Sequence, residues 1–207
     1  MAIQAISKQP STRRAALDRE RLGARLRTMR KQHGLTLKAL SGRSGVALST
    51  LSKIELGQIS VSYEKLAAVA RALDIDIAAL FDAQAQASPA ARDARPVVVR
   101  STLAQAPRYD AEHYDYRMLA TGFPGKRMTP LCGRIVARSL AQFPDYIRHP
   151  GQEFVQVLSG RVRIHFETGD VVELARDESA YFDSGVGHIY LSIGRGDAQV
   201  LVVMSER

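Results

Sequence analysis

The chain has 207 residues, of which 45% are hydrophobic, and a formal net charge of +8. A chain of this length can form one or two domains with a substantial core. The single cysteine excludes a framework of disulfides within the chain and fits a reducing compartment. No apolar run approaches the length of a membrane span, and the N-terminus does not resemble a signal peptide. We therefore expect a cytoplasmic protein with no membrane partner.

The positive charge is concentrated in the N-terminal part of the chain. Residues 1–82 contain 14 Lys and Arg against 7 Asp and Glu, a net charge of +7, whereas the remainder contains 15 against 14, a net charge of +1. A basic surface on one segment is typical of nucleic-acid binding, because cationic side chains release the counterions of the phosphate backbone. The charge therefore favours double-stranded DNA as the partner of this segment.

The first residues of the chain show little periodicity. Residues 1–17 are small or polar and include three basic side chains, which predicts a flexible basic tail. A basic arm that contacts the DNA backbone is the alternative. Residues 18–33 then have the apolar stripe of an amphipathic helix, which Gly34 is expected to end.

The stretch from residue 35 to residue 81 has the pattern of a helix-turn-helix. Thr36 is suited to cap the N-terminus of a short helix, and Gly45 permits the tight turn that follows it. A second helix would end at Gly57, and a third would begin after Ser60 or Ser62. The apolar residues at helical spacing are predicted to face inward: Leu37, Leu40, Val46, Leu51, Ile54, Leu66, Val69, Ala70 and Leu73.

On these residues, the segment 19–81 resembles the XRE-type, phage-repressor-like DNA-binding domains. The resemblance implies an all-α domain of about five helices, to which we assign residues 18–82. It also implies that the second helix of the motif lies in the major groove while the first crosses the phosphates. A helical bundle that merely contains a Gly-Val turn is the alternative. Turn chemistry and helix periods agree across several elements, which favours the DNA-binding domain.

The resemblance to phage repressors also implies which residues contact DNA. Three residues of the second helix are expected at base edges, Leu48 at a thymine methyl group and Ser49 and Lys53 as hydrogen-bonding groups. Others are expected at phosphates, which position the domain without selecting a sequence. These are Thr36, Lys38, Arg43, Thr50 and Ser62.

The character of the chain changes after residue 82. Residues 83–96 contain Ala, Gln, Pro and charged residues without a large apolar side chain, which predicts a linker. From residue 97 the apolar pattern takes a period of two, in short segments separated by turns, which predicts a β-sandwich or small barrel over 97–207. The expected strands are 97–99, 114–119, 135–137, 154–158, 162–166, 171–174, 179–182, 189–193 and 199–204.

Polar residues in this half resemble the two sequence motifs of the cupins, which are double-stranded β-helix jelly rolls. His149 and Glu153 match the first motif and His188 matches the second, while Ile147 replaces a further histidine of metal-binding members. The resemblance implies that His149, Glu153 and His188 hold one divalent metal ion. Two imidazoles and a carboxylate are the ligands of a facial triad with open positions. A pocket whose polar groups bond to each other or to an organic ligand is the alternative.

An XRE-type domain followed by a cupin resembles a family of bacterial transcriptional regulators. The resemblance implies a cupin that senses a small-molecule or metal effector and forms the homodimer. Effector binding would then shift the spacing of two DNA-binding domains on a near-palindromic operator. We expect the effector pocket to include Arg134, Tyr181 and Tyr190 beside His149, Glu153 and His188.

Two other functions remain open at this point. The same domain order also resembles the mononuclear iron epoxidases that act on hydroxypropylphosphonate, in which the three ligand-type residues would hold catalytic iron. Gly34 and Leu119 stand where that resemblance requires a lysine and a tyrosine, so we do not expect an enzyme or catalytic residues. The third function is a DNA-binding protein whose cupin only dimerises the chain.

Overall fold

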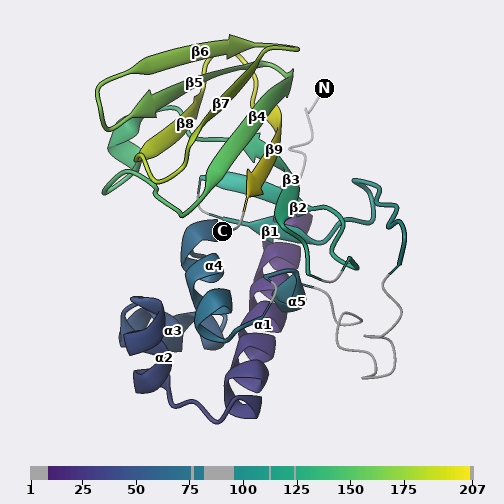
Figure 1. The fold of residues 1–207 in the computed structure, drawn as a ribbon, viewed down its shortest axis with the longest axis vertical. Coiled ribbons are helices and arrows are strands. Elements are labelled where there is room, and N and C mark those ends of the chain that lie inside the picture. The colour runs from purple at the N-terminus through teal and green to yellow at the C-terminus, as the bar shows by residue number, and fades with distance from the viewer. Residues whose placement is uncertain (1–8, 76, 82–95, 112, 124, 206–207) are drawn as a thin grey trace, which may run out of the picture.

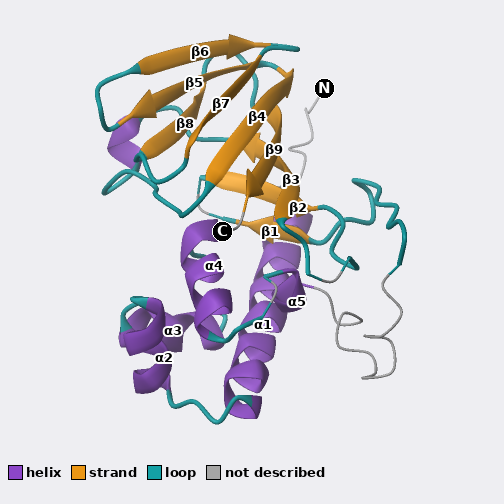
Figure 2. Cartoon of the chain, viewed as in Figure 1, coloured by secondary structure: helices purple, strands orange, loops and turns teal. Residues whose placement is uncertain are grey.

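The computed structural model describes residues 9–75, 77–81, 96–111, 113–123 and 125–205. Helices occupy one half of the molecule and antiparallel strands the other (Figure 2). This confirms the expected fold class, an all-α domain followed by an all-β cupin jelly roll. Among the described residues, no helix is both long and apolar enough to cross a membrane.

The described N-terminal half consists of five helices. The first begins earlier than the expected residue 18, so part of the predicted tail is helical, while residues 1–8 and most of the predicted linker lie outside the described residues. The helices are α1 (Gln9–Gln32), α2 (Leu37–Ser44), α3 (Leu48–Glu55), α4 (Tyr63–Ala72) and α5 (Ala78–Phe81).

Local hydrogen bonds fix the turn between α2 and α3. The Thr36 hydroxyl accepts the Ala39 N–H at 3.0 Å, as expected for an N-cap. Gly45 follows α2 with a φ of 71°, a left-handed conformation that favours glycine. The Ser41 hydroxyl donates to the Val46 carbonyl at 2.8 Å and ties the turn back to α2. These contacts set the direction in which α3 leaves the turn.

Helix α3 is held against α1 by a close backbone approach and by a buried ion pair. A Cβ atom on Gly23 would lie 2.3 Å from the Ile54 carbonyl oxygen, so only glycine allows this packing distance. The Arg30 guanidinium donates to both carboxylate oxygens of Glu55, at 2.6 and 2.9 Å, and to the Leu35 carbonyl at 2.8 Å. This paired geometry satisfies two charges that would otherwise be costly to bury.

The β domain forms two antiparallel sheets. The larger has the order β1-β2-β3-β9-β4-β7 and the smaller the order β6-β5-β8. Their inward-facing residues alternate with exposed ones, and the side chains of Val155, Val157, Val162, Ile164 and Val200 are completely buried. The strands are β1 (Arg108–Asp110), β2 (Tyr114–Met118), β3 (Met128–Ile135), β4 (Gln152–Ser159), β5 (Arg161–Phe166), β6 (Val171–Ala175), β7 (Ser179–Asp183), β8 (His188–Ser192) and β9 (Ala198–Ser205), with a short 3-10 helix η3 (Leu140–Gln142) before β4.

Two of the strand predictions were wrong. Residues 97–99 form no strand and have no strand partner among the described residues. Val97 and Val98 are 99% and 77% exposed, so neither packs into a sheet. The strand expected at 135–137 is instead β3, which begins at Met128 and contains Pro130 and Gly133. These two residues interrupt the apolar alternation on which the prediction depended.

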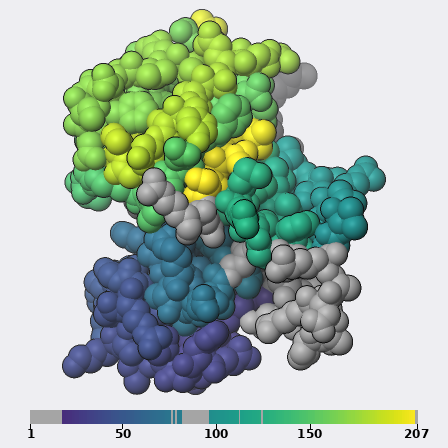
Figure 3. Space-filling view, in the orientation of Figure 1, coloured from purple at the N-terminus to yellow at the C-terminus, as the bar shows by residue number. Residues whose placement is uncertain are grey.

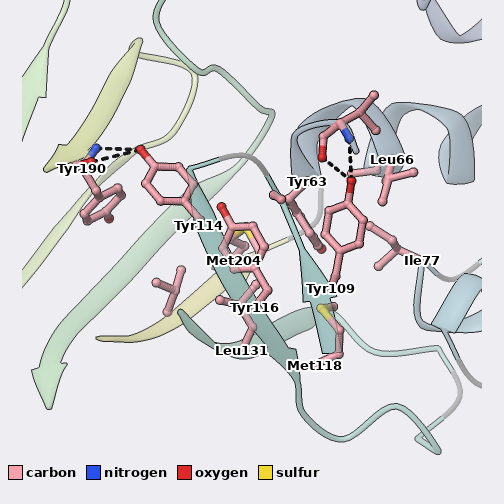
Figure 4. Close-up of a cluster of buried hydrophobic side chains, with 14 of the residues drawn as sticks. Tyr63, Leu66, Ile77, Tyr109, Tyr114, Tyr116, Met118, Leu131, Tyr190 and Met204 are labelled. Carbon is pink, nitrogen blue, oxygen red and sulfur yellow. Dashed lines mark hydrogen bonds between the residues drawn. The ribbon is translucent and has the colours of Figure 1, made fainter. Parts of the chain in front are cut away.

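The two domains share a buried joint at the N-terminus of α4. The Tyr109 hydroxyl donates to the Val61 carbonyl and accepts the Val61 N–H at 2.8 Å (Figure 4). The rings of Tyr63 and Tyr116 meet edge-on with centroids 5.9 Å apart, and Phe81 contacts the Tyr109 ring at 5.5 Å. Helix α4 therefore begins in contact with the sheet, while α2 and α3 lie at the end of the molecule remote from it (Figure 1, Figure 3).

Candidate nucleic-acid interface and metal centre

The outer surface of α3 is exposed and is not covered by the cupin domain. Ser49 and Lys53 are exposed, Leu48 is 47% exposed and Thr50 is half-buried, whereas Leu51 and Ile54 on the opposite side are buried. Helices α2 and α3, beside the C-terminal end of α1, lie at one end of the molecule (Figure 1, Figure 3). The side chains expected at base edges are therefore placed together on an accessible helix.

The surface formed by α2 and α3 carries positive charge only. Residues 21–54 contain no Asp or Glu. The next carboxylate, Glu55, is buried in its ion pair with Arg30, while Lys38, Arg43 and Lys53 are exposed. Such a surface attracts a polyanion. The hydroxyl of Thr36 caps α2 and keeps its own proton available to an acceptor such as a phosphate.

Ser62 does not belong to this surface. It is half-buried between Val61 and Tyr63, and both neighbours are buried against the cupin domain through Tyr109 and Tyr116. Its contact with a phosphate stays a prediction.

Inside the cupin, three ligand-type side chains converge. The His149 Nε2 atom lies 2.9 Å from Glu153 Oε2, and the His188 Nε2 atom lies 3.8 Å from the same oxygen. All three side chains are buried, and their ligand atoms lie within 4.8 Å of one another. Glu153 leaves β4 on the same side as His149 before it, and His188 begins β8, so two different sheets supply the cluster.

Neighbouring groups orient these side chains. The His188 Nδ1 atom lies 2.9 Å from the Val186 carbonyl oxygen, and since a carbonyl only accepts, Nδ1 carries the proton and Nε2 presents a lone pair to the cluster. The Tyr190 hydroxyl donates to Glu153 Oε1 and leaves Oε2 directed at the histidines. Outer hydrogen bonds of this kind commonly fix metal ligands.

Without a metal ion, the His149 ring interacts directly with the Glu153 carboxylate. Burial lowers the pKa of His149, but the hydrogen bond and charge of Glu153, aided by the charge of Glu64, outweigh it and raise the pKa above its ordinary value. Burial also raises the pKa of Tyr190 far above its ordinary value, so its hydroxyl stays a donor. Proton and metal would therefore compete for His149.

The residues present fit a divalent ion. Metal–ligand bonds of about 2.1 Å place the ligand atoms of one ion no more than about 4.2 Å apart, so the observed spacing needs only small side-chain movements. A buried set of two imidazole nitrogens and one carboxylate offers a facial triad. Among the described residues this is the one cluster with such geometry. Ile147 adds no ligand; its backbone pairs with that of His188.

The cluster lines a small cavity that is partly open to solvent. About 30 Å³ is open to the centre of a water molecule, which corresponds to about two waters. Two of the lining residues, Tyr63 and Glu64, come from α4 of the helical domain, so the helical domain covers part of the cavity. The remaining lining residues are Tyr114, Tyr116, Leu131, Ile135, Ile147, His149, Glu153, His188, Tyr190, Val200, Val202 and Met204.

Two residues expected in this pocket lie outside it. Arg134 is exposed on the outer face of β3, because its neighbours Gly133 and Ile135 take the buried positions, and it pairs with Asp115 at 3.3 Å. Tyr181 is 65% exposed on the outer face of β7 and its hydroxyl donates to Gln152. Tyr190 does line the cavity.

Several site residues were not foreseen from the sequence. Glu64 and Tyr63 could not be assigned to the cavity, because they belong to the other domain. Tyr114 and Tyr116 alternate along a strand that was expected, so their shared inward face was a usable signal.

Comparisons with known proteins agree with this architecture. A helix-turn-helix domain family matches residues 21–83, and a cupin domain family matches residues 141–204. No match was found among curated proteins.

One solved structure shows the same fold, and another is more distantly similar. A transcriptional regulator of the HTH_3 family from Vibrio cholerae has a TM-score of 0.58 and 20% identity, over 93% of this chain and 99% of that chain. Hydroxypropylphosphonic acid epoxidase from S. wedmorenis has a TM-score of 0.48 and 20% identity, over 90% and 98% of the two chains, a similarity too distant to bear on activity. The chain is a two-domain protein in which an XRE-like helix-turn-helix domain precedes a C-terminal cupin domain.

Proposed function

We propose that the chain is a bacterial transcriptional regulator in which α3 binds the major groove of operator DNA and the cupin binds an effector that changes operator affinity. The observation that carries this proposal is the exposed outer side of α3, with Ser49 and Lys53 on it, at the end of the molecule remote from the sheet. In this arrangement the cupin leaves the helix free to enter a groove about 12 Å wide. Since operators lie on the chromosome, the protein would act in the cytoplasm.

The surface around α3 supports DNA as the partner. Lys38, Arg43 and Lys53 are exposed with no carboxylate between them in the chain. Phosphate contacts position such a domain, and side chains of the recognition helix select the bases. We assign Thr36, Lys38, Arg43 and Thr50 to the phosphates. Leu48, Ser49 and Lys53 are assigned to base edges.

The metal-binding cluster supports a divalent cation as the effector or as its anchor. His149, Glu153 and His188 would hold the ion, which would supply a positive charge with positions open to further ligands. The effector site lies under α4, so occupancy can alter the helical domain directly. A ligand shifts operator affinity only if it binds the DNA-bound and free states with different affinity.

A homodimer is part of the proposal. Two copies related by a two-fold axis would present two α3 helices to half-sites about one DNA turn apart, which corresponds to a near-palindromic operator. Light scattering gives the mass of the protein in solution, and footprinting gives the symmetry of the protected site. A monomer that protects an asymmetric site would contradict this part.

The test of DNA binding compares two exposed arginines. An operator is first selected from a random DNA pool, and its affinity is measured by fluorescence anisotropy at several salt concentrations. Arg43→Ala on α2 should weaken binding and reduce the salt slope by about one. Arg195→Ala, in the turn between β8 and β9, removes a similar exposed charge far from α3 and should change neither. If no sequence is enriched, or both variants behave alike, the regulator proposal fails.

A second candidate function follows from the same cluster. Two histidines and a carboxylate can hold catalytic iron in an oxidative enzyme. An enzyme needs space for substrate beside the metal, and the cavity has room for about two waters while α4 covers part of it. Oxygen consumption by the iron-loaded protein with candidate substrates would support the enzyme; effector-dependent operator binding would support the regulator.

A further inference from the structure

Apart from its histidines, the cavity under α4 is lined by ionisable side chains of acidic type. Its lining includes two carboxylates, Glu64 and Glu153, and no Lys or Arg. The arginine expected there, Arg134, lies on the outer face of the sheet. Before any metal ion binds, a site with two carboxylates and no Lys or Arg favours a cation or a hydrogen-bond donor over an anionic ligand. The arginine that would have suited an acidic effector is therefore not part of this cavity.

Glu64 is the carboxylate that the helical domain contributes. It lies in the first turn of α4, next to Tyr63, which contacts the Tyr116 ring. Its Oε2 atom is excluded from solvent and has no hydrogen-bond partner among the described residues. A buried acceptor without a donor is unfavourable, and such groups in native proteins usually have a partner. The missing donor is expected from whatever occupies the cavity.

The charge of Glu64 acts on the cavity. It contributes to the raised pKa values of His149 on one side and of Tyr114 and Tyr116 on the other. Glu64 therefore lies close enough to influence both the metal-binding cluster and the tyrosine wall. The remaining space is about 30 Å³, which suits an ion with about two waters better than an organic molecule.

We propose that Glu64 is the coupling residue between the two domains, and that it accepts a hydrogen bond from water bound to a divalent cation held by His149, Glu153 and His188. This inference rests on the proposed function and specifies how the effector site is regulated. Glu64 acts here as an outer ligand, because its carboxylate is not part of the cluster of ligand atoms that lie within 4.8 Å of one another.

The packing around Glu64 indicates how its contact with a bound cation could move α4. The start of α4 is fixed to the cupin by the two hydrogen bonds between Tyr109 and Val61. The body of α4 packs against α2, which is joined to α3 by the Gly45 turn. A cation that draws Glu64 towards the cavity would therefore shift α4, which packs against α2 and so supports the recognition helix α3. By reciprocity, operator binding would change cation affinity by the same factor.

The experiment titrates the full-length protein with Co²⁺ alone, followed by the visible absorption of the bound ion, and measures operator affinity with and without Co²⁺. The variants are Glu64→Gln, which keeps the shape and removes the charge, and Glu64→Asp, which keeps the charge on a shorter side chain. His149→Ala removes a ligand. Asp74→Asn is the matched control, because it removes one carboxylate charge from an exposed position beyond α4, at a φ of 54° that asparagine tolerates.

The expected results distinguish a loss of coupling between the domains from a loss of the metal site. Outer partners of metal ligands typically change affinity by about 10–100-fold, so Glu64→Gln should weaken Co²⁺ binding by about tenfold and reduce the Co²⁺-dependent change in operator affinity towards one. Glu64→Asp should fall between Glu64→Gln and the unaltered protein, and Asp74→Asn should match the unaltered protein. His149→Ala should lose the absorption band.

Two results would overturn the inference. If Glu64→Gln binds Co²⁺ as the unaltered protein does and retains the operator response, Glu64 does not couple the domains, although the regulator proposal stands. If the unaltered protein binds no Co²⁺, the cluster is not a divalent-cation site and the inference fails. Selective operator binding still tests the proposed function in that case. Near-ultraviolet circular dichroism of each variant excludes misfolding as the cause of a loss.

Discussion

The hydroxyl of Tyr109 is the most direct test of the joint between the domains. In Tyr109→Phe the ring remains against Phe81, but the Val61 N–H and C=O lose the partner that both share. Val61 and Tyr109 are 6% and 4% exposed, so water does not replace the hydroxyl without rearrangement. A buried backbone group left without a partner costs about 1–3 kcal/mol, so the two groups together should cost about 2–6 kcal/mol.

Tyr114 provides a matched control within the cupin. Its hydroxyl donates to the Tyr190 carbonyl at 3.2 Å and accepts the Tyr190 N–H at 3.0 Å, the same pair of bonds that Tyr109 makes to Val61 (Figure 4). Tyr114→Phe therefore removes the same chemical groups without touching the domain joint. Differential scanning calorimetry distinguishes the two variants, because it reports whether the domains unfold together or apart.

Tyr109→Phe should separate the unfolding of the helical domain from that of the cupin. It should lower the first transition by about 4–24 °C, since 1 kcal/mol corresponds to about 2–4 °C for a chain of this size. Tyr114→Phe should lower the cupin transition instead. The reasoning is refuted if Tyr109→Phe melts as one transition within about 1 °C of the unaltered protein, a shift that corresponds to less than about 0.5 kcal/mol.

Three further changes test other parts of the structure. Gly23→Ala should destabilise the helical domain by about 1–3 kcal/mol, because the new Cβ atom meets the α3 backbone. Gly42→Ala has open space around it and should stabilise α2 by up to about 1 kcal/mol. Chemical denaturation measures both changes. Lys53→Ala should relax base preference at one operator position in a selection from random DNA, and an unchanged preference would remove Lys53 from the base contacts. Because the pKa of His149 is raised, its pairing with Glu153 stabilises the metal-free protein fully below about pH 6.5 and less as the pH rises through the raised pKa. Co²⁺ needs the neutral imidazole, so its affinity in calorimetric titration should increase with pH over that range and level off above it; a pH-independent affinity would show that His149 is not a ligand.

The sequence predicted the parts of the fold that depend on local chemistry. The Thr36 cap, the left-handed Gly45 and the apolar stripe of α3 follow from capping, turn and periodicity rules that act within a few residues. The convergence of His149, Glu153 and His188 followed from a resemblance between motifs, and the structure places the three together.

The features that were missed depend on how distant segments meet. Glu64 lies on a helix whose sequence pattern indicates only which side faces its own domain, so its position over the cupin cavity required the domain arrangement. Arg134 and Tyr181 were assigned to the pocket by chemical suitability. Strand register decided otherwise, because adjacent residues of a strand point to opposite faces.

The domain joint and the cavity both involve the residues at the start of α4. This proximity determines how a small ligand in the cavity could affect the DNA-binding surface of α3. Val61, Tyr63 and Glu64 are close in the chain, and each has a different relation to the cupin: a pair of backbone hydrogen bonds, an aromatic contact and an acceptor that lacks a donor. The first two hold the start of α4 whether or not a ligand is bound. In the proposed mechanism only the third contact depends on occupancy, so the effect of a bound ion would reach α4 through Glu64. A coupling of 1–3 kcal/mol is typical of allosteric proteins, and the cost of one buried acceptor without a donor is of the same order, about 1–3 kcal/mol. One hydrogen bond at this position is therefore sufficient to account for an operator response of ordinary size.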